Sequence, residues 1–182
     1  MNAYQQFARH YIRDMVYAAN DGLITTFAVV AGAQGAQLQP IVILALGFAN
    51  LVADGLAMGV GNYLGIKSER ATELAGDYRE WPETVHAARH GAVTWLSFVS
   101  AGLIPLFPFF LLSTVEASVR ASVMLVAAAL FAVGALRTAV TGRHWFRSGL
   151  EMLLVGALAG GAAYGAGWAV QHFVAGTAPG NP

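Results

Sequence analysis

A negatively charged side chain stands inside a long apolar stretch near the start of the chain. Asp21 follows Asn20 within the run Asp14–Gln34, whose flanks are almost entirely hydrophobic. In a soluble protein Asn-Asp-Gly is typical of a turn, but these flanks favour one membrane-spanning helix. A carboxylate inside such a helix costs about 2.5–3.5 kcal/mol on insertion scales, so it marks a transport pathway or a buried partner.

A second apolar run, Pro40–Tyr63, carries polar side chains at a regular interval. Asn50, Asp54, Met58 and Asn62 recur every four residues. At about 100° per residue each step drifts by only about 40°, so these side chains form one slowly winding stripe along a helix.

Antiparallel packing of the two runs would bring their acidic side chains to a similar depth. At about 1.5 Å of rise per residue, Asp21 lies about 10 Å and Asp54 about 13 Å from the inner ends of their runs. Two carboxylates supply charge for a divalent cation, and the soft thioether of Met58 favours a transition metal over calcium or magnesium. Asn50 and Asn62 would add neutral oxygen ligands.

Two other interpretations of these side chains stay open. The carboxyl groups could conduct protons alone. They could also be neutral, hydrogen-bonded structural groups, with Met58 packed as an ordinary hydrophobic residue.

Two more acidic residues mark the predicted inner mouth. Asp14, beside Arg13, could attract cations or cap the first helix. Glu151 follows Arg147 by four residues, which indicates either a local ion pair or a place on the pathway.

The connection between the second and third apolar runs carries acidic residues spaced by four. Glu69, Glu73 and Asp77 could extend the second helix with an acidic edge that concentrates divalent ions, or form a solvated face balanced by basic neighbours. His86 and His90 are also four apart, a spacing that can chelate a metal or titrate near neutrality, but no third ligand accompanies them.

Composition sets the class of protein. Of the 182 residues 57% are hydrophobic and 11% are charged, against about 25% charged in soluble domains. The chain is therefore predicted to be an all-α, multi-pass membrane protein. Its formal charge of zero and its lack of a basic cluster give no support to nucleic-acid binding.

Several classes of chemistry find no support. Cysteine is absent, which excludes disulfides, zinc–thiolate sites and thiol catalysis. The sequence has no nucleophile elbow, His-Glu-x-x-His, P-loop or Rossmann glycine pattern, so neither an enzyme nor a cofactor is expected. Residues 1–13 lack a signal-peptide core, so the first run is expected to stay in the mature protein.

Five apolar runs are long enough to cross a bilayer, at about 20 residues per crossing. They lie at residues 14–34, 40–63, 87–112, 118–140 and 148–173, and make one domain over 1–182 with a connecting loop at 64–86. Pro105 and Pro108 predict a kink or an early end in the third run. The fifth contains glycine pairs suited to tight helix packing or to a dimer seam. These pairs are Gly156 with Gly160 and Gly161 with Gly165.

Lysine and arginine predict the orientation of these runs. With the N-terminus in the cytoplasm, nine of the ten basic side chains fall on inner segments and only Arg120 falls outside. The positive-inside rule therefore places the N-terminus in the cytoplasm. Five crossings then put residues 176–182 on the opposite side and the loop 64–86 in the cytoplasm.

Four segments form an ordered set of motifs along the chain. They are Arg13-Asp14 with Ala19-Asn20-Asp21-Gly22-Leu23, then Asp54-Gly55-Leu56-Ala57-Met58-Gly59-Val60-Gly61-Asn62-Tyr63, then Leu103-Ile104-Pro105-Leu106, then Ser148-Gly149-Leu150-Glu151-Met152-Leu153-Leu154-Val155-Gly156. This set resembles the vacuolar iron transporter (VIT) family over nearly the whole chain.

The resemblance implies a five-span homodimer that moves ferrous iron, and often manganese, out of the cytoplasm in exchange for protons. Its path would run between the protomers, lined by the first two spans. On this resemblance Asp21 and Met58 are the pathway residues and Asp14 is the inner-mouth aspartate.

The chain departs from the family at two points. Iron-transporting plant members have a larger metal-binding domain between spans two and three, whereas the loop 64–86 is short and lacks methionine, as in nodulin-like and bacterial members. Asn62 also stands where the family has an acidic residue before Tyr63.

The sequence thus predicts a proton-coupled antiporter that exports Fe2+ or Mn2+ as cargo. Asp21 would bind the cation when ionised and carry a proton on the return step. A bacterial inner membrane is expected, with a vacuole-like organelle as the alternative. The rival functions are a passive divalent-cation channel and a non-transporting structural or regulatory membrane protein.

Overall fold

A computed structural model describes residues 3–75, 86–138, 142 and 144–174, and side chains of the first stretch over 11–72. These described residues form helices and turns, with no strand among them. The helices are α1 (Ala3–Gly35), α2 (Pro40–Ala75), α3 (Ala87–Gly102), α4 (Pro108–Leu111), α5 (Val115–Leu136) and α7 (Trp145–Phe173). The all-α prediction is confirmed.

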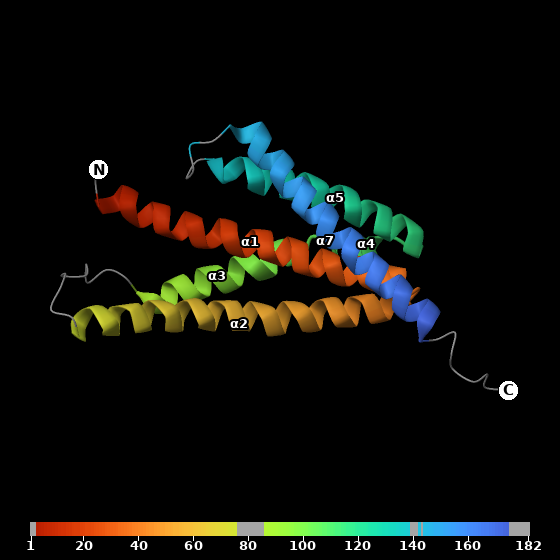
Figure 1. Cartoon of the computed structure of the whole chain (residues 1–182), viewed down its shortest axis with the longest axis horizontal. Helices are drawn as coiled ribbons and strands as arrows, with labels where there is room; N and C mark the ends of the chain where they lie inside the picture. Colours follow the sequence, from red (N-terminus) through yellow and green to blue (C-terminus); the bar gives the residue numbers. More distant parts are fainter. Residues whose placement is uncertain (1–2, 76–85, 139–141, 143, 175–182) are drawn as a thin grey trace.

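α1 is the central helix of the bundle. It runs the length of the molecule, and α2 returns beside it with α3 between them (Figure 1). α5 and α7 pack together on the other side of α1, which contacts α2, α3, α5 and α7. α1 begins at one end of the bundle, where α2 ends and α3 begins, and α7 ends at the other (Figure 1).

Neighbouring helices cross at glycines, where backbone meets backbone. A Cβ atom on Gly167 of α7 would overlap the carbonyl oxygen of Gly32 in α1, and one on Gly91 of α3 would lie 2.6 Å from that of Gly59 in α2. Small residues at such crossings allow the close approach that helix association in a bilayer needs. The remaining crossings pair Gly22 with Gly102 and Gly134 with Gly149.

The two predicted glycine pairs of α7 have different surroundings. Gly156 packs against Leu130 of α5 and Gly160 against Phe27 of α1, which confirms tight packing inside the bundle. Gly161 and Gly165 have no described atom within 4 Å of an added Cβ. This second pair therefore lies on the outside of α7.

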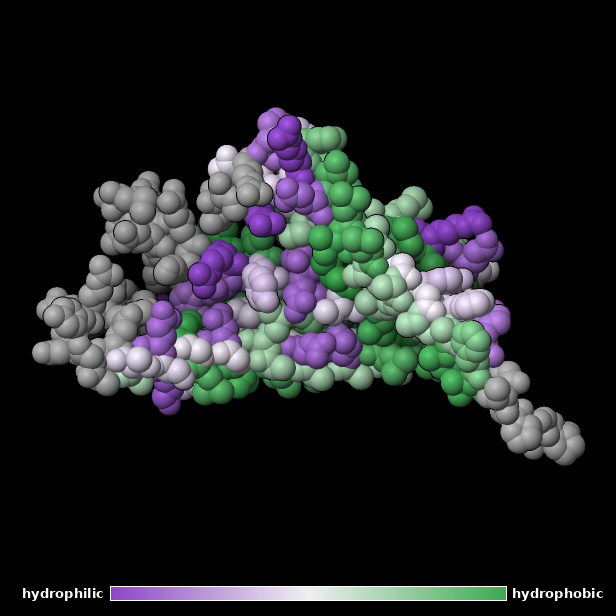
Figure 2. All heavy atoms as spheres, in the orientation of Figure 1, coloured by the Kyte–Doolittle hydropathy of each residue, from purple (hydrophilic) through white to green (hydrophobic). Residues whose placement is uncertain are grey.

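The surface of the bundle is largely apolar. Val52, Leu56 and Val60 of α2 are each more than half exposed, and Figure 2 shows broad hydrophobic areas interrupted by hydrophilic residues at the ends and in the middle of the drawn face. Among the described residues, four helical stretches are long and apolar enough to cross a membrane: Tyr11–Gly35, Pro40–Thr72, Val115–Leu136 and Trp145–Phe173. The chain is therefore a multi-pass membrane protein.

The third predicted run is divided rather than continuous. α3 has 16 residues, about 24 Å at 1.5 Å per residue, which is shorter than the hydrocarbon core of about 30 Å. Turns follow over 103–107, and α4 begins at Pro108. The buried hydroxyl of Ser122 in α5 donates a hydrogen bond of 2.8 Å to the carbonyl oxygen of Pro105. This bond satisfies a backbone group that the break in the helix leaves open.

α2 extends past the predicted crossing at residues 40–63. The helix continues to Ala75 and has 36 residues. The helical extension suggested by the acidic spacing is thus present, and exposed Glu69 lies on it. The side chain of Glu73 and the whole of Asp77 lie outside the described residues.

Candidate functional site

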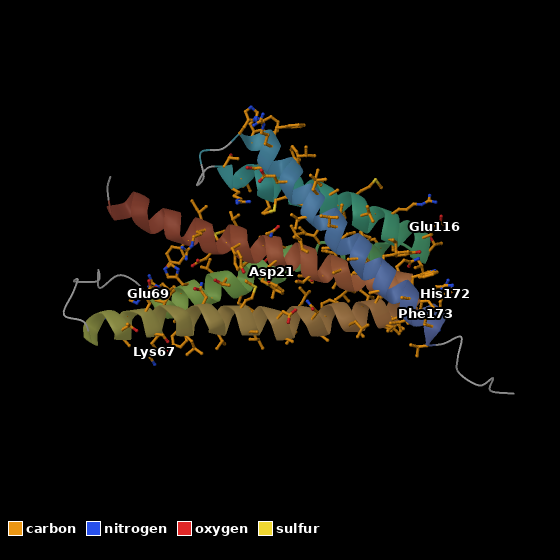
Figure 3. All side chains as sticks on the ribbon, in the orientation of Figure 1. Asp21, Lys67, Glu69, Glu116, His172 and Phe173 are labelled. Carbon is orange, nitrogen blue, oxygen red and sulfur yellow. The ribbon has the colours of Figure 1, made fainter. Side chains whose placement is uncertain are left out.

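An open cavity of about 560 Å³ lies between α1, α2 and α3. Its lining residues are Arg13, Asp14, Tyr17, Asp21, Met58, Gly61, Asn62 and Thr94. Four of these, Asp14, Asp21, Met58 and Asn62, were predicted from the sequence as site residues. Figure 3 shows Asp21 on the side of α1 that faces the α2–α3 pair.

Helical spacing explains why these side chains share one cavity. Asp14, Tyr17 and Asp21 are separated by three and four residues, which puts them on one face of α1. Met58 and Asn62 are one turn apart on the facing side of α2, and both are half-buried. The stripe predicted on α2 therefore meets the polar face of α1.

A hydrogen-bonded network around Asp14 ties the three helices together. His90 Nδ1 of α3 lies 2.6 Å from Asp14 Oδ2, and Asn62 Nδ2 of α2 donates to the same oxygen at 3.2 Å. Asn62 Nδ2 also lies 2.7 Å from Thr94 Oγ1 of α3. The ring of Tyr11 stacks on that of His90 at 4.2 Å between centroids.

This network corrects two interpretations. Asp14 does not cap a helix, because α1 begins at Ala3, eleven residues earlier. His90 is only 4% exposed and bonds to Asp14, so it does not turn Nδ1 toward a metal shared with exposed His86. The histidine side chain fixes the inner-mouth carboxylate instead.

Asp54 and Asn50 are not among the residues that line this cavity. Asp54 is half-buried one turn from Met58. Asn50 lies a further turn along α2. Hydrophilic residues reach the middle of α2 on the face drawn in Figure 2.

Two amide groups near these acids are buried without a hydrogen-bond partner among the described residues. They are Nδ2 of Asn50 and Oδ1 of Asn20. Buried polar atoms are normally paired, so an open one indicates a position for water or an ion. Asn20 is a functional candidate that sequence analysis used only as the neighbour of Asp21.

The other predicted inner-mouth residues lie away from the cavity. Glu69 is near the far end of α2 (Figure 3), and Glu151 is on α7; both side chains are exposed. Neither lines the cavity. Glu73 is not described at the side-chain level, so its predicted role stays a prediction.

Sequence analysis did not single out Tyr17 or Thr94 as lining residues. Tyr17 could have been found, since it stands midway between Asp14 and Asp21 on the same helical face. Thr94 could not, because its place depends on how α3 packs between α1 and α2.

The cavity can hold a cation by its charge and its mixture of oxygen and sulfur donors. Carboxylates of Asp14 and Asp21 are hard ligands, and the thioether of Met58 is a soft one. Among the described residues, however, no three His, Asp or Glu side chains come together to hold a metal ion. The described part of one chain thus offers two carboxylates and one thioether at this cavity.

Comparison with known proteins decides the family. The sequence profile of the VIT family matches residues 12–85 and 76–168, which include every residue lining the cavity. The chain belongs to the VIT family. The two matched segments overlap over residues 76–85, in the connection between α2 and α3.

Curated relatives carry the name vacuolar iron transporter. Vacuolar iron transporter 1 of Arabidopsis thaliana is 28% identical over 91% of this chain and 88% of its own length. Vacuolar iron transporter 2 of Oryza sativa is 28% identical over 90% of this chain and 89% of its own length. The vacuolar iron transporter of Plasmodium falciparum is 33% identical over 38% of this chain and 25% of its own length.

The plant VIT proteins contain residues that this chain lacks. The alignment with the Arabidopsis protein runs over 220 positions, more than the 182 residues of the whole chain. The expected shortening of the loop at 64–86 stays a prediction.

Proposed function

We propose that this VIT-family protein is a proton-coupled exporter of divalent transition metal, with Fe2+ or Mn2+ as its cargo. The observation that carries the proposal is the cavity in which Asp14, Asp21 and Met58 meet between helices apolar enough to cross a membrane. The names of the relatives support iron as a cargo.

Asp21 is the group that exchanges metal for protons. An ionised carboxylate in a low-dielectric site attracts either a metal ion or a proton, and each excludes the other because both neutralise the same charge. Asp54, one turn from Met58 on α2, would add negative charge on the same side-chain stripe. Met58 adds preference for a softer ion.

A second copy of the chain would complete the ligand set. In a twofold dimer each pathway residue appears twice, so two sparse sets combine around one ion. The exposed apolar side chains of Val52, Leu56 and Val60 on α2 support a partner or lipid on that side. The path then runs at the interface between the protomers, and lipid covers the rest.

We place the N-terminus in the cytoplasm and count five crossings, with α3, the turns 103–107 and α4 together making the third. The location is a bacterial inner membrane, with a vacuole-like organelle membrane as the alternative. The basic residues near the start of α1 and the end of α2 support this orientation.

Metal uptake into proteoliposomes under an imposed pH gradient tests the proposal. With Fe2+, Mn2+, Zn2+ and Co2+ compared, we expect Asp21→Asn to lower Fe2+ or Mn2+ uptake at least tenfold. Glu116→Gln is the control, because this exposed carboxylate on α5 pairs with Arg120 away from the cavity.

Other outcomes would assign a different function. Metal flux that persists without a pH gradient and follows voltage alone would indicate a passive channel. An Asp21→Asn variant that folds, dimerises and keeps full metal tolerance in cells would indicate a structural or regulatory membrane protein.

A further inference from the structure

A second cavity lies on another side of the α2–α3 pair. It is a groove of about 300 Å³ with an almost wholly apolar lining. The lining residues are Leu56, Gly59, Val60, Tyr63, Ala88, Gly91, Ala92 and Trp95. None of them lines the cavity that contains Asp21.

The groove owes its shape to the glycine crossing of the two helices. Gly59 and Gly91 bring the backbones together and leave a floor without side chains. The side chains of Leu56, Val60 and Trp95 line the groove beside this floor, and each is at least 38% exposed. The groove is therefore apolar and open to the surroundings of the bundle.

A basic cavity of about 310 Å³ continues the groove at the end where α2 leaves the apolar run. Tyr63 and Ala88 line both cavities, so the two are adjoining. The other lining residues are Ile66, Lys67, Arg70, His86 and Ala87. Lys67, Arg70 and His86 thus surround one space, and no acidic side chain is among the described residues that line it.

The positions of individual side chains strengthen this charge pattern. The ammonium nitrogen of Lys67 lies 5.9 Å from the centroid of the Tyr63 ring, a cation–π distance that holds it near the junction of the two cavities. Glu69 points to the opposite side of α2 from Lys67 (Figure 3). Ala87 and Ala88 belong to the first turn of α3, whose dipole also favours an anion.

We propose that the groove and the basic cavity together bind one anionic phospholipid. Its phosphate lies among Lys67, Arg70 and His86, and an acyl chain follows the floor of Gly59 and Gly91. Basic pockets between helices at a membrane surface recognise lipid phosphates in this way.

A lipid accounts for both cavities, whereas a soluble phosphate compound accounts only for the basic one. Tyr63 lies where the apolar part of α2 gives way to its charged extension, the level at which tyrosine and tryptophan meet lipid headgroups. The adjoining groove then runs toward the apolar part of the helix pair, where an acyl chain belongs.

Lipid titration of the purified, full-length protein in detergent tests this site. Native mass spectrometry would measure binding of phosphatidylglycerol and of phosphatidylcholine with the same acyl chains. We expect tighter binding of phosphatidylglycerol, lowered at least tenfold in the double variant Lys67→Gln/Arg70→Gln. Arg70→Lys, which keeps the charge, should retain most of the binding.

Arg89→Gln is the matched control. Arg89 is exposed in the first turn of α3, at the same end of the bundle, but it does not line the basic cavity. A site-specific interaction predicts nearly unchanged phosphatidylglycerol binding in this variant. An equal loss in Arg89→Gln would overturn the proposal in favour of general attraction to a basic surface.

The groove is tested separately by filling it. Ala92→Phe places a ring beside Trp95 and should weaken binding of both lipids several-fold. Unchanged binding in Ala92→Phe and in the double variant would refute the site. Displacement of phosphatidylglycerol by equimolar glycerol phosphate would also overturn it, because it would assign the site to a soluble phosphate.

Discussion

The Nδ1 atom of His90 lies 2.6 Å from Oδ2 of Asp14 and fastens α3 to the pathway face of α1. Asn62 donates to the same oxygen, while Oδ1 of Asp14 is 3.9 Å from Nε of Arg13. An amide suits position 62 because it can donate to Asp14, whereas an ionised acid there would repel it. This contact gives a physical reason for the departure from the family pattern at Asn62.

Replacement of His90 should destabilise the bundle. His90→Ala removes a buried partner of Asp14, and the loss of such a bond costs about 1–3 kcal/mol. Thermal unfolding in detergent, followed by tryptophan fluorescence, would measure the change. His144→Ala is the control, because His144 is exposed before α7 and makes no side-chain cap hydrogen bond; a shift as large as that of His90→Ala would contradict the network's role.

Sulfur at position 58 should matter for metal choice rather than for folding. Met58→Leu keeps the side-chain volume but removes the soft ligand, so Fe2+ and Mn2+ uptake should fall several-fold while proton leak stays unchanged. Met152→Leu is the matched control, since Met152 is buried between α5 and α7, away from the cavity. Equal loss of metal uptake and proton leak in Met58→Leu would argue against a thioether ligand.

The crossing of α1 and α7 should not tolerate a side chain. Gly167→Ala places a methyl group against the carbonyl oxygen of Gly32, and such overpacking costs about 1–3 kcal/mol. Gly161→Ala on the open side of α7 should leave stability unchanged or raise it by up to about 1 kcal/mol. Thermal unfolding would measure the melting temperatures of both variants. Similar melting temperatures would contradict the close packing of α1 against α7 at Gly167.

The hydroxyl of Ser122 should stabilise the turns at which the third run breaks. Ser122→Ala leaves the buried carbonyl of Pro105 without its 2.8 Å donor, at a cost of about 1–3 kcal/mol. Ser100→Ala removes a hydroxyl from an exposed position on α3 and should change stability little. Hydrogen–deuterium exchange would further show faster exchange over residues 103–107 in Ser122→Ala alone; unchanged exchange there would contradict the role of this bond.

Much of the site could be predicted from spacing alone. Asp21 and Met58 each lie on a helical face within an apolar run. Inside a bilayer, polar side chains on such a face are expected to pack against a neighbouring helix rather than against lipid. The meeting of the α1 and α2 faces follows from their antiparallel order. Asp54 was expected beside Met58 at the ion; it is not among the residues that line the cavity, and its role stays a prediction.

Contacts between residues far apart in the chain could not be predicted from the sequence. His90 looked like half of a chelating pair because its spacing to His86 is local, whereas its partner Asp14 is 76 residues away. The early end of α3 was foreseen from Pro105, but the compensating donor on α5 was not, since nothing local links Ser122 to that turn. The extension of α2 past Tyr63, by contrast, was suggested by local spacing, because Glu69 and Glu73 are one turn apart on a helix.

α2 continues as one helix from Pro40 to Ala75, without a break among its described residues. At about 1.5 Å per residue it is about 54 Å long, so roughly 24 Å extends past a hydrocarbon layer of about 30 Å. Met58 of the cavity and Arg70 of the extension belong to the same continuous helix. A torque applied at Arg70 is therefore transmitted along α2 to the cavity, and a partner bound to the extension would set the angle of Met58.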